Sequence, residues 1–265
     1  MPFAASAGLR LYYDEAGRGP TLLLLHGIGS NSRSFRYQLA GLADVARVVA
    51  LDLPGYGRSD DPPRPFTMAD LADYAAAVLD ALGADQADVL GHSLGGVVAQ
   101  MLFHRHPERV RSLVLADTNP GSGSLPEPER SARVQRRLDA LSHQTPRAMA
   151  EARAPALLSP DAPPELVADL VDIMAEVRPA AYRAAAIAMG TTDLTELLTA
   201  ISVPCLVVCG DCDQVTPVAT ARLLAERIPG ARLAIIAGAG HASNQERPDQ
   251  FNDLVRTFLT SRHPT

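Results

Sequence analysis

The sequence predicts an α/β fold, in which a mostly parallel, twisted sheet carries helices on both faces. Short apolar segments alternate with helical segments along most of the 265 residues. The apolar segments are uninterrupted, which is typical of strands buried on both faces of a parallel sheet. The alternation stops between residues 118 and 199 and then resumes. We therefore expect a core made of residues 1–117 and 200–265, and a helical insertion at 118–199 that caps the carboxyl edge of the sheet as a lid.

The expected elements follow in chain order. Residues 9–15, preceded by Phe3, form one or two strands with no helix between them, which fits an antiparallel edge. The other strands are expected at residues 21–25, 47–53, 87–90, 111–116, 203–209 and 232–237. A helix is expected from Thr67, which can form a capping box with Asp70, to Gly83. Further helices are expected at residues 94–106, 218–228 and 248–259.

The insertion begins with a loop rich in glycine, serine and proline at residues 119–128. Amphipathic helical segments separated by prolines follow it. Apolar residues recur at helical spacing over residues 166–174, a pattern typical of helix packing. We expect no cofactor there.

Composition and charge exclude several function classes. The sequence has 24 arginines, no lysine and a net charge of −6. Without lysine, neither a pyridoxal phosphate Schiff base nor a Walker A phosphate clamp is possible. The arginines are scattered, which argues against a nucleic-acid partner.

The sequence also gives no sign of a membrane or metal partner. No apolar run is long enough to suggest a membrane span, and the first residues lack the features of a secretory signal. We therefore expect a cytoplasmic protein. Cys205, Cys209 and Cys212 match no common zinc spacing and are too few for a disulfide framework. We expect Cys205 and Cys209 to be buried on one face of a strand. Nothing in the sequence indicates an oligomeric state.

The strongest chemical signal is the segment Gly91-His92-Ser93-Leu94-Gly95. It matches G-x-S-x-G and lies between an expected strand and an expected helix. A sharp turn of this kind exposes the serine hydroxyl, and the flanking glycines let the chain segments pass closely. We predict that Ser93 is a nucleophile.

A serine hydroxyl needs a base and an acid to activate it. His241, which follows the last expected strand in Gly238-Ala239-Gly240-His241, is the candidate base. His92 adjoins the serine, but we expect it to face away and to be structural.

The acid has three candidates. Asp213 is favoured because it lies in the loop after the strand at 203–209. Asp117, at the end of the strand at 111–116, is an alternative. Asp211 is the third candidate, but its expected role is to hold the loop through backbone amides.

Two backbone amides are expected to form an oxyanion hole. The amide of Leu94 begins the helix after the serine, where N–H groups have no acceptor within the helix. The amide of Ile28, in the segment His26-Gly27-Ile28-Gly29-Ser30, is the expected second donor. This chemistry requires no cofactor and no metal.

These motifs resemble the landmarks of the α/β-hydrolase superfamily, and the resemblance covers nearly the whole chain apart from the insertion. In chain order the landmarks are His26-Gly27, Asp52-Leu53-Pro54-Gly55-Tyr56-Gly57-Arg58-Ser59, Gly91-His92-Ser93-Leu94-Gly95-Gly96, Asp213 with Pro217, and Gly240-His241. The resemblance implies the α/β-hydrolase fold.

Residues 228–232 and 240–246 look like those of the 3-oxoadipate enol-lactonase and carboxylesterase group. This likeness implies that a small-molecule ester or lactone is hydrolysed through an acyl-enzyme. The same triad also serves carbon–carbon bond hydrolases of the meta-cleavage type and cofactor-free perhydrolases. A ligand receptor with the hydrolase fold is the non-enzyme alternative. Arg33, just after the oxyanion loop, is a candidate for holding a carboxylated substrate, although a solvent-facing arginine is the favoured interpretation.

Overall fold

The computed structural model describes residues 3–6 and 8–261. Eight strands form one sheet in the order β1-β2-β4-β3-β5-β6-β7-β8. They are β1 (Phe3–Ser6), β2 (Leu9–Ala16), β3 (Thr21–Leu25), β4 (Arg47–Leu51), β5 (Ala87–His92), β6 (Val110–Ala116), β7 (Cys205–Gly210) and β8 (Arg232–Ile236). β2 pairs antiparallel with β1 and β4, and the other pairs are parallel. The predicted fold class and its antiparallel edge are confirmed.

The central strands are apolar throughout because their alternate side chains enter two different hydrophobic cores. All five residues of β3 are buried. Leu23 and Leu25 belong to one core, whereas Leu22 and Leu24 belong to the other. Burial on both faces therefore accounts for the uninterrupted apolar pattern.

Cys205 and Cys209 lie in the same core, as expected from their even spacing on β7. All three cysteines are free, and Cys212 is partly exposed. Burial raises the pKa of the Cys205 thiol to about 12. Cys205 is therefore an inert packing residue rather than a reactive thiol.

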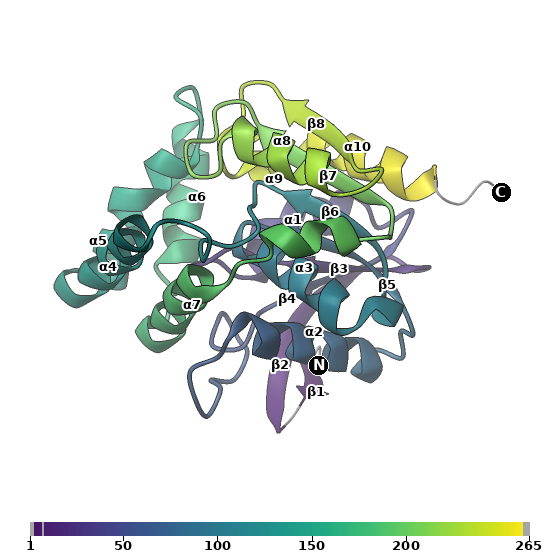
Figure 1. Cartoon of the computed structure of the whole chain (residues 1–265), viewed down its shortest axis with the longest axis horizontal. Helices are drawn as coiled ribbons and strands as arrows, with labels where there is room; N and C mark the ends of the chain where they lie inside the picture. The colour runs from purple at the N-terminus through teal and green to yellow at the C-terminus, as the bar shows by residue number, and fades with distance from the viewer. Residues whose placement is uncertain (1–2, 7, 262–265) are drawn as a thin grey trace.

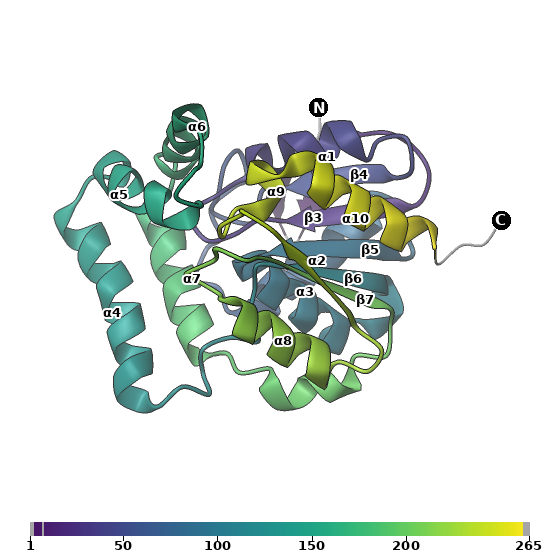
Figure 2. The ribbon, with the colours of Figure 1, turned by 90° about the horizontal axis from the view of Figure 1, so that it is seen from above.

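Helices cover both faces of the sheet (Figures 1 and 2). The first face is covered by α1 (Arg36–Gly41) and α10 (Pro248–Thr260), and the second by α2 (Met68–Ala81), α3 (Leu94–Arg105) and α8 (Val218–Arg227). A short helix, α9 (Ser243–Glu246), connects the loop after β8 to α10.

The start of α2 has the expected capping box. The Thr67 hydroxyl accepts a hydrogen bond from the Asp70 amide at 3.1 Å, and the Asp70 carboxylate accepts one from the Thr67 amide at 2.8 Å. Two N–H groups that the helix leaves unpaired are thereby satisfied.

The segment between β6 and β7 is helical and lies on one side of the sheet, on the left in Figures 1 and 2. We call α4 to α7 the inserted helices: α4 (Glu127–His143), α5 (Pro146–Arg153), α6 (Pro164–Met174) and α7 (Pro179–Thr191). Residues of α5 and α6 form a third hydrophobic cluster with Ala242, which lies in the loop after β8. The inserted helices are thus packed against the loops at the carboxyl edge of the sheet.

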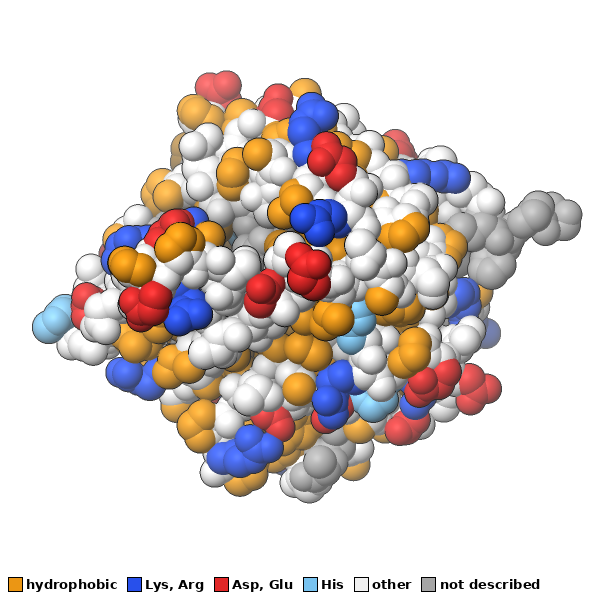
Figure 3. Space-filling view, viewed as in Figure 1, with side chains coloured by type: hydrophobic (Ala, Val, Ile, Leu, Met, Phe, Trp, Pro, Cys, Tyr) orange, Lys and Arg blue, Asp and Glu red, His pale blue; other side chains and the backbone are white. Residues whose placement is uncertain are grey.

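The surface is mixed in charge. On the face seen in Figure 3, positive and negative side chains are interspersed and no broad area of one sign appears. Among the described residues, no helix combines the length and the apolar character that crossing a bilayer requires.

Candidate active site

Ser93 occupies the sharp turn between β5 and α3. Its backbone has a φ of 53° and a ψ of −116°. Residues with a side chain rarely adopt a positive φ. Among the described non-glycine residues, only Ser93 and Asp117 have a positive φ. Such strain persists where the surrounding structure holds it, and it is concentrated at functional sites.

The glycines of the turn allow the chain segments to approach one another. A Cβ atom on Gly91 would overlap the carbonyl group of Gly95. A Cβ atom on Gly95 would overlap the carbonyl group of Leu25, at the end of β3. The G-x-S-x-G spacing therefore arises from close backbone contacts among β3, β5 and the start of α3.

Ser93, His241 and Asp213 form one hydrogen-bonded line. The Ser93 Oγ lies 3.0 Å from His241 Nε2, and His241 Nδ1 lies 2.9 Å from Asp213 Oδ2. All three side chains are buried. They follow β5, β8 and β7 respectively, so the carboxyl edge of the parallel strands brings them together.

The surroundings of Asp213 favour an ionised carboxylate. Burial raises the pKa of Asp213, but the hydrogen bond and charge of His241, together with bonds from Thr216, outweigh burial and lower it. Asp213 Oδ1 accepts the amides of Val215 and Thr216 at 2.7 and 2.9 Å, and Oδ2 accepts the Thr216 hydroxyl at 2.6 Å. These donors fix the carboxylate in place toward His241.

The other two acid candidates contact different groups. Asp117 Oδ1 accepts the Gly210 amide at 2.9 Å, and its Oδ2 accepts the Ser243 hydroxyl at 2.5 Å. Asp211 accepts the Gly238 amide at 2.8 Å. Both therefore hold backbone segments of the site, and neither is bonded to His241 in the part of the chain that the structure describes.

Asp117 makes stability depend on pH in a specific direction. Burial, reinforced by repulsion from Asp213, holds its pKa well above the ordinary value. Above about pH 4 the Asp117 carboxyl group loses its proton in the unfolded chain but keeps it in the folded chain. The free energy of unfolding of the wild type therefore falls as the pH rises. We expect Asp117→Asn to gain stability relative to wild type by up to about 1.4 kcal/mol per pH unit in this range. Urea unfolding at several pH values measures the difference, and a difference that stays constant or shrinks with rising pH would contradict this assignment.

The two expected oxyanion donors come from the start of α3 and from the loop after β3. Leu94 is the first residue of α3, so its N–H has no acceptor within the helix. Ile28 lines the cavity over Ser93. Its loop is held by His26, whose Nδ1 lies 2.8 Å from the Gly27 carbonyl and whose Nε2 accepts the Leu53 amide at 3.1 Å.

His92 is oriented differently from the expectation. Its ring does not face away from the site, because it lines the cavity with its centroid 5.2 Å from that of His241. Burial and the neighbouring His241 lower the pKa of His92 to about 4, so the ring is neutral near pH 7. Its Nε2 lies 2.7 Å from the backbone carbonyl of His241, which fixes the position of that loop. The only sequence signal was its position beside the serine.

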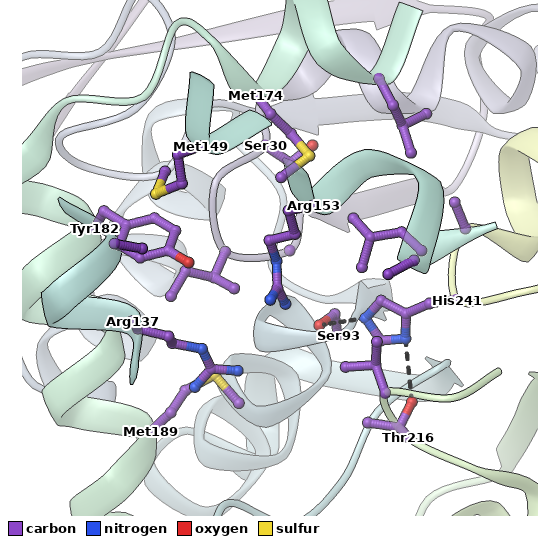
Figure 4. A pocket seen from close by; sticks show the side chains of 18 of the residues that line it. Ser30, Ser93, Arg137, Met149, Arg153, Met174, Tyr182, Met189, Thr216 and His241 are labelled. Atoms are coloured by element: carbon purple, nitrogen blue, oxygen red, sulfur yellow. Dashed lines mark hydrogen bonds between the residues drawn. The ribbon is translucent and has the colours of Figure 1, made fainter. Parts of the chain in front are cut away.

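A cavity of about 600 Å³ opens over Ser93 and His241 (Figure 4). One wall consists of loops at the carboxyl edge of the sheet, and the opposite wall comes from the inserted helices. Its apolar part includes Met149, Leu170, Met174, Tyr182 and Met189. A volume of this size fits a small organic molecule.

Arginines also reach this cavity, but Arg33 is not among the residues that line it. Arg33 instead forms a partly exposed ion pair with Glu176 at 2.5 Å, so the solvent-facing interpretation is correct. Arg137 of α4 and Arg153 of α5 point into the cavity. Neither arginine was predicted as a site residue, although the segment 133–137 is rich in arginine.

Asp117, Cys209 and Asp213 form a buried group whose ligand atoms lie within 4.8 Å of one another. Burial and the two nearby carboxylates raise the pKa of the Cys209 thiol, which disfavours the thiolate that a metal requires. The carboxylates already accept the hydrogen bonds described above. We assign no metal to this group.

Residues 20–248 match the family described as the alpha/beta hydrolase fold. The chain belongs to this family. This alpha/beta hydrolase is 30% identical to 3-oxoadipate enol-lactonase 2 of Acinetobacter baylyi, with 93% of this chain and 91% of the relative covered. It is 33% identical to the pimeloyl-acyl-carrier-protein methyl ester esterase of Aeromonas hydrophila, with 93% and 98% covered.

The alpha/beta hydrolase is also similar to a solved thermophilic esterase from Thermogutta terrifontis, determined with malate bound. The two structures have a TM-score of 0.90 at 29% identity, and the match covers 99% of this chain and 98% of the esterase. The prediction of a hydrolase similar to the enol-lactonase and esterase group is therefore confirmed.

Proposed function

We propose that the protein is a serine hydrolase that cleaves a carboxylic ester or a lactone, as an enol-lactonase or a carboxylesterase does. The observation that carries the proposal is the hydrogen-bonded line from Asp213 through His241 to Ser93, which ends at the floor of the cavity. The names of the similar proteins, an enol-lactonase and two esterases, support the same substrate class.

The geometry supports acyl transfer in two steps. His241 Nε2 takes the Ser93 proton as Oγ attacks the carbonyl carbon, and the alcohol leaves with a proton returned by His241. Water then attacks the acyl-enzyme with His241 as the base, which releases the acid and restores the serine. Asp213 keeps the Nδ1 proton of His241 in place and stabilises the charged imidazole.

The amides of Ile28 and Leu94 are proposed to bind the oxyanion. Each donor of this kind contributes about 3–4 kcal/mol to lowering the barrier. The N-terminus of α3 adds a positive dipole end at the same place. We propose further that residues 118–199 form a cap over the core made by residues 1–117 and 200–265, and that the cap encloses the substrate.

A serine-directed fluorophosphonate probe tests the nucleophile. We expect the wild-type protein to be labelled at Ser93, because His241 activates that hydroxyl. Ser93→Ala should not be labelled, whereas Ser122→Ala, which removes another hydroxyl lining the cavity, should be labelled like wild type. Mass spectrometry of the labelled peptide gives the site. Unlabelled wild type, or label that persists in Ser93→Ala, would refute the proposal.

A further inference from the structure

The cavity is strongly positive although the protein as a whole is acidic. Four arginines line it: Arg133, Arg136, Arg137 and Arg153, of which Arg133 is paired with Glu129 at 2.9 Å. No aspartate or glutamate is among the described residues that line it. Elsewhere arginines are commonly paired with acids, as Arg47 is with Glu15 at 2.7 Å and Arg109 is with Asp80 at 2.6 Å. The cavity therefore departs from the charge pattern of the rest of the molecule.

Arg137 and Arg153 have no protein partner for their charge. Within residues 3–6 and 8–261, neither guanidinium has a hydrogen bond or an ion pair, and both side chains are only partly exposed. Burial, with repulsion from Arg153 and the other cavity arginines, lowers the pKa of Arg137. Removing an unpaired cation from water is costly, so such groups are normally compensated. A bound anion would supply the compensation.

The position of these arginines connects the charge to the reacting group. In Figure 4 the guanidinium of Arg153 extends toward Ser93, and that of Arg137 lies beside it, next to Met189. Arg137 comes from α4 and Arg153 from the end of α5, so the anion site is built by the inserted helices. The apolar part of the lining, which includes Met149, Leu170 and Met174, suits a short carbon chain between the two ends of a substrate.

We propose that the substrate is an ester or lactone that carries a carboxylate away from its reacting carbonyl, and that Arg137 and Arg153 bind this carboxylate. The inference rests on the proposed function of the same site. The planar, forked guanidinium matches a carboxylate with two parallel hydrogen bonds. The reaction is unchanged: the acyl C–O bond breaks, the hydroxyl of water joins the acyl carbon, its proton goes to the alcohol, and the second carboxylate does not react.

Matched substrates separate charge from shape. Monomethyl glutarate has a free carboxylate, and methyl glutaramate replaces it with a neutral amide of similar size. For wild type we expect kcat/KM to be about 10- to 100-fold higher for the carboxylate, which is the range for a hydrogen bond to a charged group. The comparison is extended to cyclic esters with two lactones that differ only in a substituent, which is a free carboxylate in one and a carboxamide in the other.

Variants locate the carboxylate site. In Arg137→Gln and Arg153→Gln, KM for monomethyl glutarate should rise about tenfold or more, while kcat/KM for methyl glutaramate should stay within about threefold. Arg153→Lys keeps the positive charge but lacks the planar guanidinium group, so it should retain part of the preference for monomethyl glutarate over methyl glutaramate. Arg33→Gln is the matched control, because Arg33 is paired with Glu176 outside the cavity, and it should behave as wild type. Thermal unfolding verifies that each variant is folded.

A binding measurement keeps this inference separate from the proposed function. Ser93→Ala should bind glutarate, and the added Arg137→Gln or Arg153→Gln change should abolish that binding in calorimetry. Equal kcat/KM for the two glutarate substrates, or a preference that survives both arginine variants, would overturn the carboxylate site while leaving the hydrolase intact. Tighter binding of inorganic phosphate than of glutarate would also overturn it. If fluorophosphonate does not label Ser93, the proposed hydrolase function is refuted. Glutarate binding would still test independently whether Arg137 and Arg153 form a carboxylate site.

Discussion

Replacing Asp213 with asparagine is expected to lower kcat by about 10³- to 10⁴-fold. Asp213 Oδ2 lies 2.9 Å from His241 Nδ1 and accepts a hydrogen bond from its N–H group. An amide cannot offer two acceptor oxygens there, so His241 would adopt the tautomer with its proton on Nε2, facing Ser93 instead of accepting from it. Steady-state kinetics with an aryl ester measures the loss, and thermal unfolding verifies the fold.

Asp117→Asn is the matched control for this change. Asp117 is buried and close to the site, but its carboxyl group accepts hydrogen bonds from Gly210 and Ser243 instead of contacting His241. We expect kcat to fall by less than about tenfold. If Asp117→Asn were the more damaging variant, the acid would have to be reassigned to Asp117.

Gly95→Ala is expected to cost about 3 kcal/mol or more of stability, because the new methyl group would overlap the carbonyl of Leu25. For a chain of this length the corresponding loss in Tm is roughly 6–10 °C. Because α3 would have to shift away from β3, the Ser93 hydroxyl and the Leu94 amide should also move. A displacement of about 1 Å costs on the order of 100-fold in rate, which kinetics on the folded fraction would measure.

Ala99→Gly in the same helix controls for a general weakening of α3. Ala99 is buried, and the change should cost only about 1 kcal/mol because glycine is a poor helix former. It leaves the turn at Ser93 unchanged, so activity should be near that of wild type. A Gly95→Ala protein as stable as wild type would show that the close approach of α3 to β3 is not required.

The core of this fold could be predicted because its signals are local. The strand Thr21–Leu25 has the same bounds in the sequence analysis and in the structure, since burial on both faces leaves an uninterrupted apolar segment. The start of α2 followed from the side chains of Thr67 and Asp70 alone. The turn at Ser93 followed from glycines whose spacing is set by backbone contacts.

The features of the site that the sequence left open or did not indicate depend on contacts between distant segments. Asp213 was the favoured acid among three aspartates, but it is the packing of β7 beside β8 that brings it to His241. The local sequence around Arg33 or Arg137 does not reveal whether its charge is paired, yet Glu176 neutralises the first and nothing in the described chain neutralises the second. The direction of Arg153 likewise depends on how α5 packs over the sheet.

The position of β8 has a consequence for how this protein becomes functional. β8 is one of the two edge strands of the sheet, and the loop after it carries His241, 148 positions beyond Ser93. Contacts so distant along the chain carry a large loop-closure cost, and proteins rich in them fold slowly. A nascent or refolding chain can therefore bury most of its core while the serine is still without its base. The proposed triad is complete only when β8 and the loop after it are in place, so turnover by this triad would require a fully assembled sheet.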